Sequence, residues 1–270
     1  MILPMSIITL LTDFGTEDEY VGLMKGVILS IHPRAAIVDI THRIDIQDVV
    51  QAAYTIYASY RYFPPGSIHL IVVDPGVGTG RAVLALETRK HIFIAPDNGI
   101  LTRLLDDGDF MELVSITNTA YFLNPVSRTF HGRDIFAPVG AHIAEGAALS
   151  RLGPQMSPHE VVRLDNLQAR LLQGGEIVGK IIAIDHFGNL ISNVEMRQLA
   201  QYLQADQTTR LKIRIGSHVI HGLSETYGNV PTHTALALIG SRGYLEIAVN
   251  CGSAARQLNV RRGATVRVTI

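Results

Sequence analysis

Short apolar runs alternate with segments of helical periodicity along the first 150 residues. The apolar runs are rich in Ile, Val and Leu and are bounded by turn residues, so we expect strands at residues 7–12, 36–40, 68–73, 83–86, 92–95 and 113–116. Apolar positions recur at helical spacing over residues 20–31, 49–57 and 135–143. The alternation predicts an α/β domain whose largely parallel sheet is flanked by helices.

Polar and turn residues predict where the first two helices begin and end. The sequence Thr-Glu-Asp-Glu at 16–19 has the pattern of a capping box, and His-Pro at 32–33 ends the helix that follows. The second helix is expected from about Asp45, and Pro-Pro-Gly at 64–66 ends it before the next strand.

The pattern changes after about residue 150. Gly-Pro at 153–154 and Ser-Pro at 157–158 lie in a stretch with little regular signal, which we interpret as the crossing between two domains. From Glu176 onward the chain is dominated by expected strands, at residues 178–184, 211–215, 235–239, 245–249 and 264–270. We therefore predict an α/β domain over residues 1–165 and a smaller all-β domain, of sandwich or barrel type, over residues 166–270.

Composition and charge narrow the class of protein. Of the 270 residues, 47% are hydrophobic and 17% charged, which excludes a fibrous or disordered chain. The 23 Lys and Arg residues are balanced by 24 Asp and Glu, so the basic excess of a nucleic-acid-binding protein is missing. No apolar stretch approaches the 18 or so residues of a membrane helix, and the apolar start has no basic leader. We expect a cytoplasmic protein with a small-molecule partner, without nucleic acid or membrane.

Cysteine and histidine usage bears on metals and disulfides. The single cysteine, Cys251, excludes an intrachain disulfide and a thiolate zinc cage, suits a reducing cytoplasm, and is expected to be a small buried side chain. Eleven histidines are present, but they form no His-Glu-x-x-His motif or comparable ligand cluster. The sequence therefore predicts no metal site.

Four expected strands of the first domain end in or next to an aspartate: Asp13, Asp39, Asp74 and Asp97. Ligands of open α/β sheets bind outside the carboxyl ends of the strands, so these carboxylates could line one edge of one cleft. Asp is also common as a helix cap or turn residue after a strand. Both interpretations stay open for each of the four.

The loop from Asp74 to Arg81 contains three glycines at alternate positions. It lacks the Gly-Lys-Ser/Thr ending of a P-loop and leads into a strand, which excludes the dinucleotide-binding fingerprint. The glycines allow close backbone approach to a ligand, and Asp74 and Arg81 could form an ion pair beside it. A glycine-rich hairpin is the alternative.

Three further loops carry polar groups. His131 stands at the start of the helical stretch 135–143, where a neutral imidazole is favoured and can act as a base, although a lone histidine is more often structural. The loops 185–189 and 241–244 offer amide, hydroxyl and aromatic groups suited to a nucleobase and an amino-acid carboxylate, or they are ordinary turns.

Taken together, these segments resemble the S-adenosyl-L-methionine hydroxide adenosyltransferase family, the hydrolytic relatives of fluorinase and chlorinase. The resemblance covers nearly the whole chain. Its motifs are LTDFG at 11–15, VDPGVGTGR at 73–81, APDNG at 95–99, TFHGRD at 129–134, IDHFGN at 184–189 and GSRGY at 240–244.

The resemblance implies hydrolysis of S-adenosylmethionine to adenosine and L-methionine, without cofactor or metal. It also implies a homotrimer whose sites lie between the N-terminal domain of one subunit and the C-terminal domain of its neighbour. The catalytic set falls on Asp74, Arg81 and His131, which would activate a water that attacks the ribose 5′ carbon. A positioned base typically contributes about 10² to 10⁴ in rate.

Substrate contacts follow from the same resemblance. Asp13 would bind the ribose hydroxyls, and Asp18 and Asp185 the methionine ammonium. The adenine or the methionine carboxylate would meet Asn189, Ser241 and Arg242.

Two alternatives to hydrolysis stay open. The fluorinase has a serine where this chain has Gly132 and an aromatic residue where it has His131, whereas Gly132 agrees with the chlorinase. Ile191 replaces an aromatic residue that stacks on the base in fluorinase. Halide-dependent, chlorinase-like adenosyl transfer is therefore one alternative, and a sensor that binds S-adenosylmethionine or a nucleoside without catalysis is the other.

Overall fold

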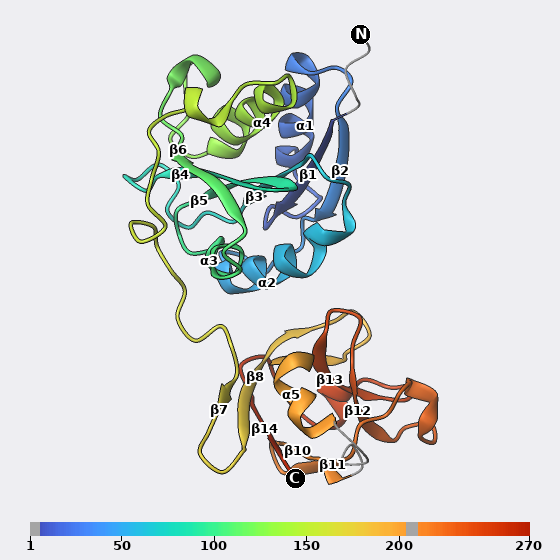
Figure 1. Cartoon of the computed structure of the whole chain (residues 1–270). Helices are drawn as coiled ribbons and strands as arrows, with labels where there is room; N and C mark the ends of the chain where they lie inside the picture. Colours follow the sequence, from blue (N-terminus) through green and yellow to red (C-terminus); the bar gives the residue numbers. More distant parts are fainter. Residues whose placement is uncertain (1–5, 204–209) are drawn as a thin grey trace. The chain divides into compact units, whose positions relative to one another are not determined.

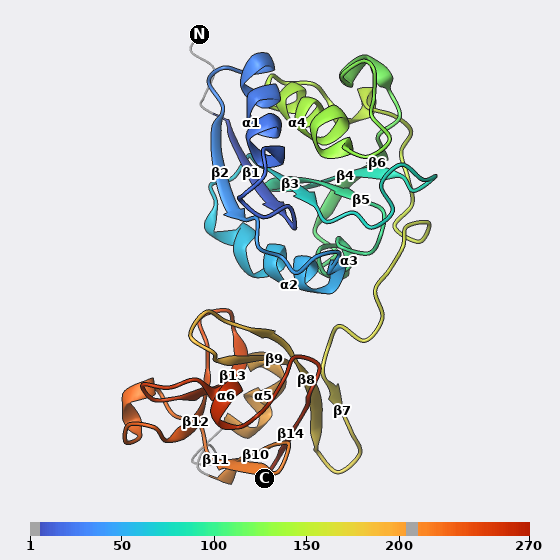
Figure 2. The ribbon, with the colours of Figure 1, turned by 180° about the vertical axis from the view of Figure 1, so that it is seen from behind.

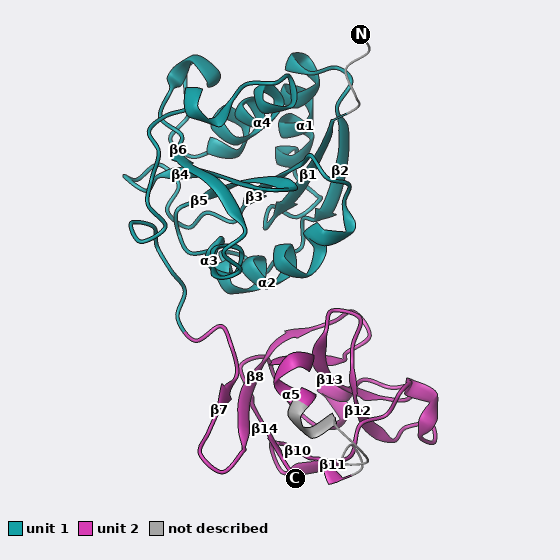
Figure 3. Ribbon diagram, viewed as in Figure 1, with its two compact units in different colours: residues 1–165 teal, residues 166–270 magenta. Residues whose placement is uncertain are grey.

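The computed structural model describes residues 6–203 and 210–270. The chain divides into two compact units, unit 1 (Met1–Asp165) and unit 2 (Asn166–Ile270), shown in Figure 3. Each unit has its own hydrophobic core, formed by two clusters of buried side chains in unit 1 and by a large cluster in unit 2. Each therefore buries its apolar surface by itself.

Unit 1 contains a six-stranded sheet with the strand order β2-β1-β3-β5-β4-β6. Neighbours β2, β1, β3 and β5 pair in parallel, whereas β4 pairs antiparallel with both β5 and β6. The predicted largely parallel sheet is confirmed, with β4 running against the other strands. The strands are β1 (Ile7–Thr12), β2 (Ala36–Thr41), β3 (Ser67–Val72), β4 (Val83–Thr88), β5 (His91–Pro96) and β6 (Phe110–Ser115).

Helices cover both faces of this sheet (Figure 1). α1 (Tyr20–Ile31) and α4 (Ala137–Ala144) lie on one face, and α2 (Val49–Ser59) and α3 (Thr102–Asp106) lie on the other. Because the central strands are covered on both sides, β3 is buried along its whole length and lacks the alternation of a half-exposed strand.

Three helix starts differ from the expected ones. The second helix, expected from about Asp45, is α2, which begins at Val49 with Asp48 as its N-cap residue. The capping box at residues 16–19 is wrong: α1 begins at Tyr20, and its N-cap residue, Glu19, makes no side-chain capping bond. The backbone N–H of Gly15 donates to the carbonyl of His42, which holds the segment after β1 as a loop. The third helix begins with a π-helical turn, Gly132–Phe136, before α4.

The strand order creates a switch point between β1 and β3. The chain passes from β1 to β2 on one side of β1 and returns to β3 on its other side. The loops that leave the carboxyl ends of β1 and β3 therefore diverge, and open α/β sheets bind ligands at such a point. Asp13 begins the first loop, and Asp74 lies at the start of the second.

Unit 2 is an eight-stranded antiparallel sheet in the order β11-β10-β14-β8-β9-β13-β12, with β7 paired to β8. The two end strands, β11 and β12, contact each other, so the sheet is nearly closed into a barrel, as the sequence predicted. α5 (Met196–Leu203) follows β9, and Figure 2 shows α6 (Ala254–Gln257) beside β13. The strands are β7 (Arg170–Leu171), β8 (Ile177–Ile184), β9 (Leu190–Glu195), β10 (Lys212–Ile215), β11 (His218–His221), β12 (Ala235–Ile239), β13 (Tyr244–Val249) and β14 (Thr265–Thr269).

The expectation for Cys251 is wrong, because its side chain is exposed. Strand β13 ends at Val249, and Cys251 lies in the turn that follows, in the left-handed backbone region at φ 52°. A cysteine is usually buried as a small apolar side chain, but in this turn the thiol is exposed. Among the helices of the described residues, none has both the length and the hydropathy to span a membrane.

Candidate active site

Asp74 and Arg81 stand at the two ends of the β3 to β4 loop and form the ion pair that the sequence predicted. Arg81 Nε donates to Asp74 Oδ1 at 2.9 Å, and Arg81 Nη2 donates to Asp74 Oδ2. The side chain of Arg81 is 10% exposed and that of Asp74 is 5% exposed. Because two parallel bonds fix the plane of the guanidinium, the charge of Arg81 has a defined place next to the carboxyl end of β3.

His131 joins this pair. Arg81 Nη2 lies 2.9 Å from His131 Nδ1. A guanidinium has only donors, so Nδ1 must accept and the ring is neutral, with its hydrogen on Nε2. Burial lowers the pKa of His131, and the positive charge of Arg81 lowers it further. Asp74, Arg81 and His131 thus form one connected set of side chains, the carboxyl-edge network.

A glycine allows the β3 to β4 loop to approach the segment that carries His131. Gly78 has φ +75°, and a Cβ there would lie 2.1 Å from the carbonyl oxygen of Arg128. Only glycine fits this position. The sequence suggested that these glycines admit a ligand, whereas the close neighbour at Gly78 is the chain itself.

Asp134 positions His131, a role that the sequence did not reveal. Its side chain is 1% exposed, and its carboxylate accepts hydrogen bonds from the backbone N–H of Ser127 at 2.8 Å and from Arg133 Nε at 2.6 Å. These bonds tie together the two ends of the segment in which His131 lies. The adjacent Arg-Asp pair in the sequence was the available signal.

The carboxyl-edge network borders a pocket of about 300 Å³ at the switch point of the sheet. Arg81 is not among its lining residues and acts on it through Asp74 and His131. Asp13 accepts a hydrogen bond from the backbone N–H of Gln47 at 2.8 Å, and burial raises the pKa of Asp13. The pocket is lined by Asp13, Phe14, Ile46, Gln47, Val72, Asp74, Val77, Thr129, Phe130, His131 and Gly132.

Other carboxylates expected at this site lie elsewhere. Asp39 forms an ion pair with Lys25 at 2.6 Å and lies 3.1 Å from His42 Nε2, and Asp97 accepts a hydrogen bond from the backbone N–H of Val162. These two aspartates stabilise the fold, so the expectation of one shared cleft is wrong for them. Asp18 is exposed in the loop before α1 and does not line the pocket.

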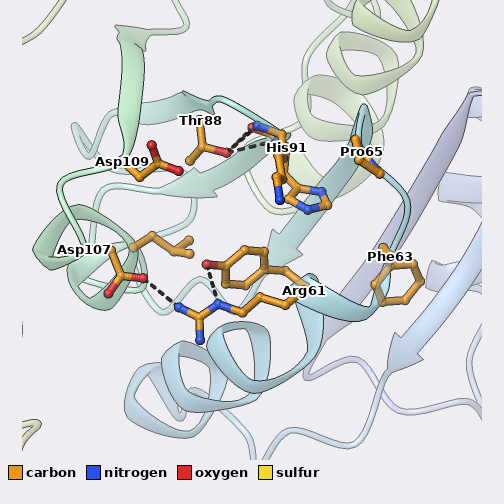
Figure 4. A pocket seen from close by; sticks show the side chains of 10 residues that line it. Arg61, Phe63, Pro65, Thr88, His91, Asp107 and Asp109 are labelled. Carbon is orange, nitrogen blue, oxygen red and sulfur yellow. Dashed lines mark hydrogen bonds and ion pairs between the residues drawn. The ribbon is translucent and has the colours of Figure 1, made fainter.

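A second cavity of unit 1, of about 390 Å³, opens at the opposite edge of the sheet, where β3 and β5 begin (Figure 4). Arg61 reaches across it to the hydroxyl of Tyr60 and to Asp107. Behind His91, a buried chain runs from its Nδ1 to His69 Nε2 at 3.3 Å and from His69 Nδ1 to Thr9 Oγ1 at 2.7 Å. Thr9, His69 and His91 form the amino-edge network. No site residue predicted from the sequence lies here.

The predicted residues of unit 2 gather around one pocket of about 590 Å³. Asp185 is held by the backbone N–H groups of Phe187 and Asn189 and by the side-chain amide of Asn189. Tyr227 and Glu246 also line the pocket, although the sequence did not point to them. The lining residues are Asp185, Phe187, Asn189, Ile191, Tyr227, Ser241, Arg242, Glu246, Val249, Cys251 and Gly252.

The described parts of the chain hold no group of three or more His, Cys, Asp or Glu side chains suited to a metal ion. At the unit 1 pocket the side chains present a neutral imidazole, a fixed guanidinium and a buried carboxylate. Unit 2 adds a roomy pocket with amide, hydroxyl, guanidinium and carboxyl groups.

Comparison with known proteins identifies the family. Residues 8–153 match the SAM hydroxide adenosyltransferase N-terminal domain, and residues 179–267 match its C-terminal domain. A Thermus thermophilus protein named (R)-S-adenosyl-L-methionine hydrolase is 35% identical, with 96% of this chain and 97% of that protein covered.

Two more similarities span the chain. A Nocardia brasiliensis protein named fluorinase is 30% identical over 98% of this chain and 97% of its own length. The crystal structure of an uncharacterized conserved protein from Thermotoga maritima superposes with a TM-score of 0.90 at 35% identity, covering 97% of this chain and 100% of that one. The pockets of both units lie within the ranges that the two family domains match, and the chain belongs to the SAM hydroxide adenosyltransferase family.

Proposed function

We propose that this protein hydrolyses S-adenosyl-L-methionine to adenosine and L-methionine by attack of water on the ribose 5′ carbon. The observation that carries the proposal is the carboxyl-edge network, which places a neutral His131 beside a fixed Arg81 at a ligand-binding edge of the sheet. Relatives that span the chain and are named (R)-S-adenosyl-L-methionine hydrolase support the same reaction.

The reaction needs a good nucleophile more than a good leaving group. The bond from the water oxygen to C5′ forms while the C5′–S bond breaks, and its electron pair returns to sulfur, so methionine leaves as a neutral thioether without protonation. In the observed tautomer the water proton goes to His131 Nδ1 as Arg81 shifts its bond from that nitrogen to the water oxygen. Asp74 holds Arg81 in place, and this fixed charge stabilises the developing hydroxide.

The remaining site residues bind the substrate. Asp13 meets the ribose hydroxyls, and Gly132 leaves room beside the reacting carbon. Asp185 meets the methionine ammonium, and Asp18, although it lies outside the unit 1 pocket, meets it from the exposed loop before α1. Asn189, Ser241 and Arg242, which line the unit 2 pocket, contact the adenine or the methionine carboxylate. The protein acts in the cytoplasm without a metal or cofactor.

Isotope labelling tests the reaction. Purified protein is incubated with S-adenosylmethionine in H₂¹⁸O, with and without chloride and with a chelator, and the products are identified by mass. Hydrolysis at C5′ predicts ¹⁸O in adenosine and none in methionine, in every buffer. A 5′-chlorinated nucleoside that forms only with chloride would indicate halide transfer, and binding without any product would indicate a sensor.

The surroundings of Gly132 leave little room for a larger side chain. A Cβ at this position would lie 3.2 Å from Met24 Sδ and 3.2 Å from a ring carbon of Phe130. The serine that the fluorinase carries there would therefore crowd these side chains. Glycine itself is compatible with chloride, which is why the labelling experiment includes it.

The proposed homotrimer, with unit 1 of one subunit facing unit 2 of its neighbour, is tested by complementation. His131→Ala inactivates the unit 1 half of a site and Arg242→Ala the unit 2 half. If sites are shared between subunits, co-expression of the two inactive variants restores activity in about a quarter of the sites. Sites built within one chain would stay inactive, and mixing the variants after separate assembly is the control.

A further inference from the structure

Glu246 is a carboxyl group in the middle of a buried strand. All six residues of β13 are buried, and Glu246 itself is 6% exposed. Its neighbours along the strand, Leu245 and Ile247, belong to the core of unit 2. Glu246 instead lines the unit 2 pocket with Asp185, Ser241 and Arg242.

Only one of its two oxygens has a protein partner in the described residues. Oε1 accepts a hydrogen bond from the hydroxyl of Tyr227 at 2.7 Å. For Oε2 the described residues provide neither a hydrogen bond nor an ion pair. Burial raises the pKa of Glu246 and the negative charge of Asp185 adds to this rise, whereas the Tyr227 hydrogen bond and the positive charge of Arg242 oppose it.

The chain makes room for the second oxygen. A Cβ at Gly240 would lie 2.4 Å from Glu246 Oε2. Gly240 begins the Gly-Ser-Arg-Gly segment that also supplies Ser241 and Arg242 to the pocket. The same short loop therefore leaves space for the carboxyl and provides two of the polar groups beside it.

Folding stability does not account for this arrangement. A buried carboxylate that forms no ion pair destabilises the folded protein, and an amide or apolar side chain would avoid the loss. A hydrogen-bond acceptor kept in a pocket at the expense of stability indicates that a ligand supplies the missing donor. The donor must be an N–H or O–H group that reaches Oε2 when the pocket is filled.

We infer that Glu246 is a specificity residue of the substrate pocket, where its Oε2 accepts a hydrogen bond from an N–H group of the substrate and Tyr227 positions the carboxyl. The inference rests on the proposed function. S-adenosylmethionine carries two such groups, the 6-amino group of adenine and the methionine ammonium. Each can be removed separately in an analogue, so the partner of Glu246 can be identified.

A double-mutant cycle between protein and substrate tests whether Glu246 binds an N–H group of the substrate. Wild type and Glu246→Gln are assayed with S-adenosylmethionine, with the inosine analogue that lacks the 6-amino group, and with the analogue that lacks the α-amino group. With the natural substrate, Glu246→Gln is expected to raise KM about 10- to 100-fold, with a smaller change in kcat. With the analogue that lacks the partner group, the same substitution has little further effect.

Melting temperatures and control variants distinguish an effect on substrate binding from an effect on folding stability. The melting temperature of Glu246→Gln is expected to stay the same or rise, because a buried charge is removed. Tyr227→Phe is expected to raise KM less than Glu246→Gln, and Glu225→Gln, an exposed carboxyl outside the pocket, leaves KM unchanged.

Equal effects of Glu246→Gln on all three substrates would overturn the inference, as would a lower melting temperature with unchanged KM. If wild type makes no adenosine, the proposed function is wrong, and binding of S-adenosylmethionine is then measured by titration calorimetry. Weaker binding to Glu246→Gln than to wild type would still support the role of Glu246.

Discussion

Unit 1 contains two histidine networks at opposite edges of one sheet, one half-buried beside a pocket and one fully buried. The carboxyl-edge network joins His131 to Arg81 and Asp74, and the amino-edge network joins His91 and His69 to Thr9. Burial lowers the pKa of the histidines in both, to about 3 for His69. A perturbed histidine pKa therefore does not by itself distinguish a reactive site from a structural one.

The two networks differ in charge and in their place in the topology. The carboxyl-edge network holds a guanidinium and a carboxylate at the switch point, where two loops diverge around a pocket. The amino-edge network consists of neutral groups between the starts of buried strands, and aromatic rings surround it: Tyr60, Phe63 and Phe93 all pack against His69. Fixed charge beside a neutral imidazole, at a ligand-binding edge, is what favours catalysis.

The largest expected effect is a difference in kcat between substitutions in the two networks. His131→Ala is expected to lower kcat about 10²- to 10⁴-fold, because the proton acceptor is lost while the binding pockets remain. His91→Gln, the matched change at the other edge, is expected to leave kcat within about twofold per folded molecule. Single-turnover formation of adenosine, together with the Kd for S-adenosylmethionine, provides the measurement. Equal rates in His131→Ala and wild type would exclude the assigned role of His131.

The amino-edge network is expected to matter for stability as pH falls. The pKa of His69 is about 3 in the folded protein and about 6.5 in an unfolded chain, so below pH 6.5 the unfolded state binds more protons. The stability contribution of neutral His69 is complete above pH 6.5 and is lost progressively down to about pH 3. Between pH 6.5 and 4 the loss amounts to about 3 kcal/mol.

Urea unfolding of wild type and His69→Gln at several pH values measures the contribution of His69 to the free energy of unfolding. The difference in unfolding free energy between the two proteins should shrink or change sign as pH falls, because the glutamine does not titrate. Parallel pH dependences would show that His69 is not the group responsible. Activity per folded molecule at pH 7.5 should be similar in both proteins.

Local sequence patterns predicted the ion pair of the carboxyl-edge network but missed the amino-edge network, and His131 was linked to the ion pair by the family resemblance. The Asp74 to Arg81 ion pair followed from a short loop between two strands, and its geometry depends on nearby residues. The amino-edge network joins Thr9, His69 and His91 from three strands, and Glu246 acquires its role from Tyr227, 19 residues away. Contacts between distant segments leave no periodic signal, so only the fold reveals them.

Contacts between distant segments also explain the wrong expectations. The capping box at residues 16–19 obeyed a local rule, but the contact between Gly15 and His42 decided the position of the loop. Asp39 and Asp97 stood at the expected strand ends, and partners from other segments engaged them. The central strands of unit 1, such as β3, were predictable because burial on both faces produces continuous apolar runs.

A smaller effect concerns the pH profile of the carboxyl-edge network. Activity is expected to fall at low pH as His131 is protonated. Because the charge of Arg81 holds the pKa of His131 below its ordinary value, Arg81→Gln should raise that pKa and move the low-pH limb of kcat/KM to higher pH. Arg89→Gln, an exposed arginine that pairs with Asp109 at the other edge, is the control and should leave the limb in place. An unmoved limb in Arg81→Gln would show that another group sets it.

The smallest expected effect concerns whether the substrate of the carboxyl-edge network also occupies the unit 2 pocket. Cys251 is the single cysteine of the chain, is exposed and lines that pocket, so its reaction with a thiol reagent reports on occupancy of the pocket. In His131→Ala, which binds substrate without consuming it, saturating S-adenosylmethionine should slow the labelling of Cys251 several-fold. Methionine or adenosine alone should protect less, because each fills only part of the pocket. An unchanged labelling rate at saturation would show that the substrate bound by this protein does not cover Cys251, and the unit 2 half of the proposed site would have to be placed elsewhere.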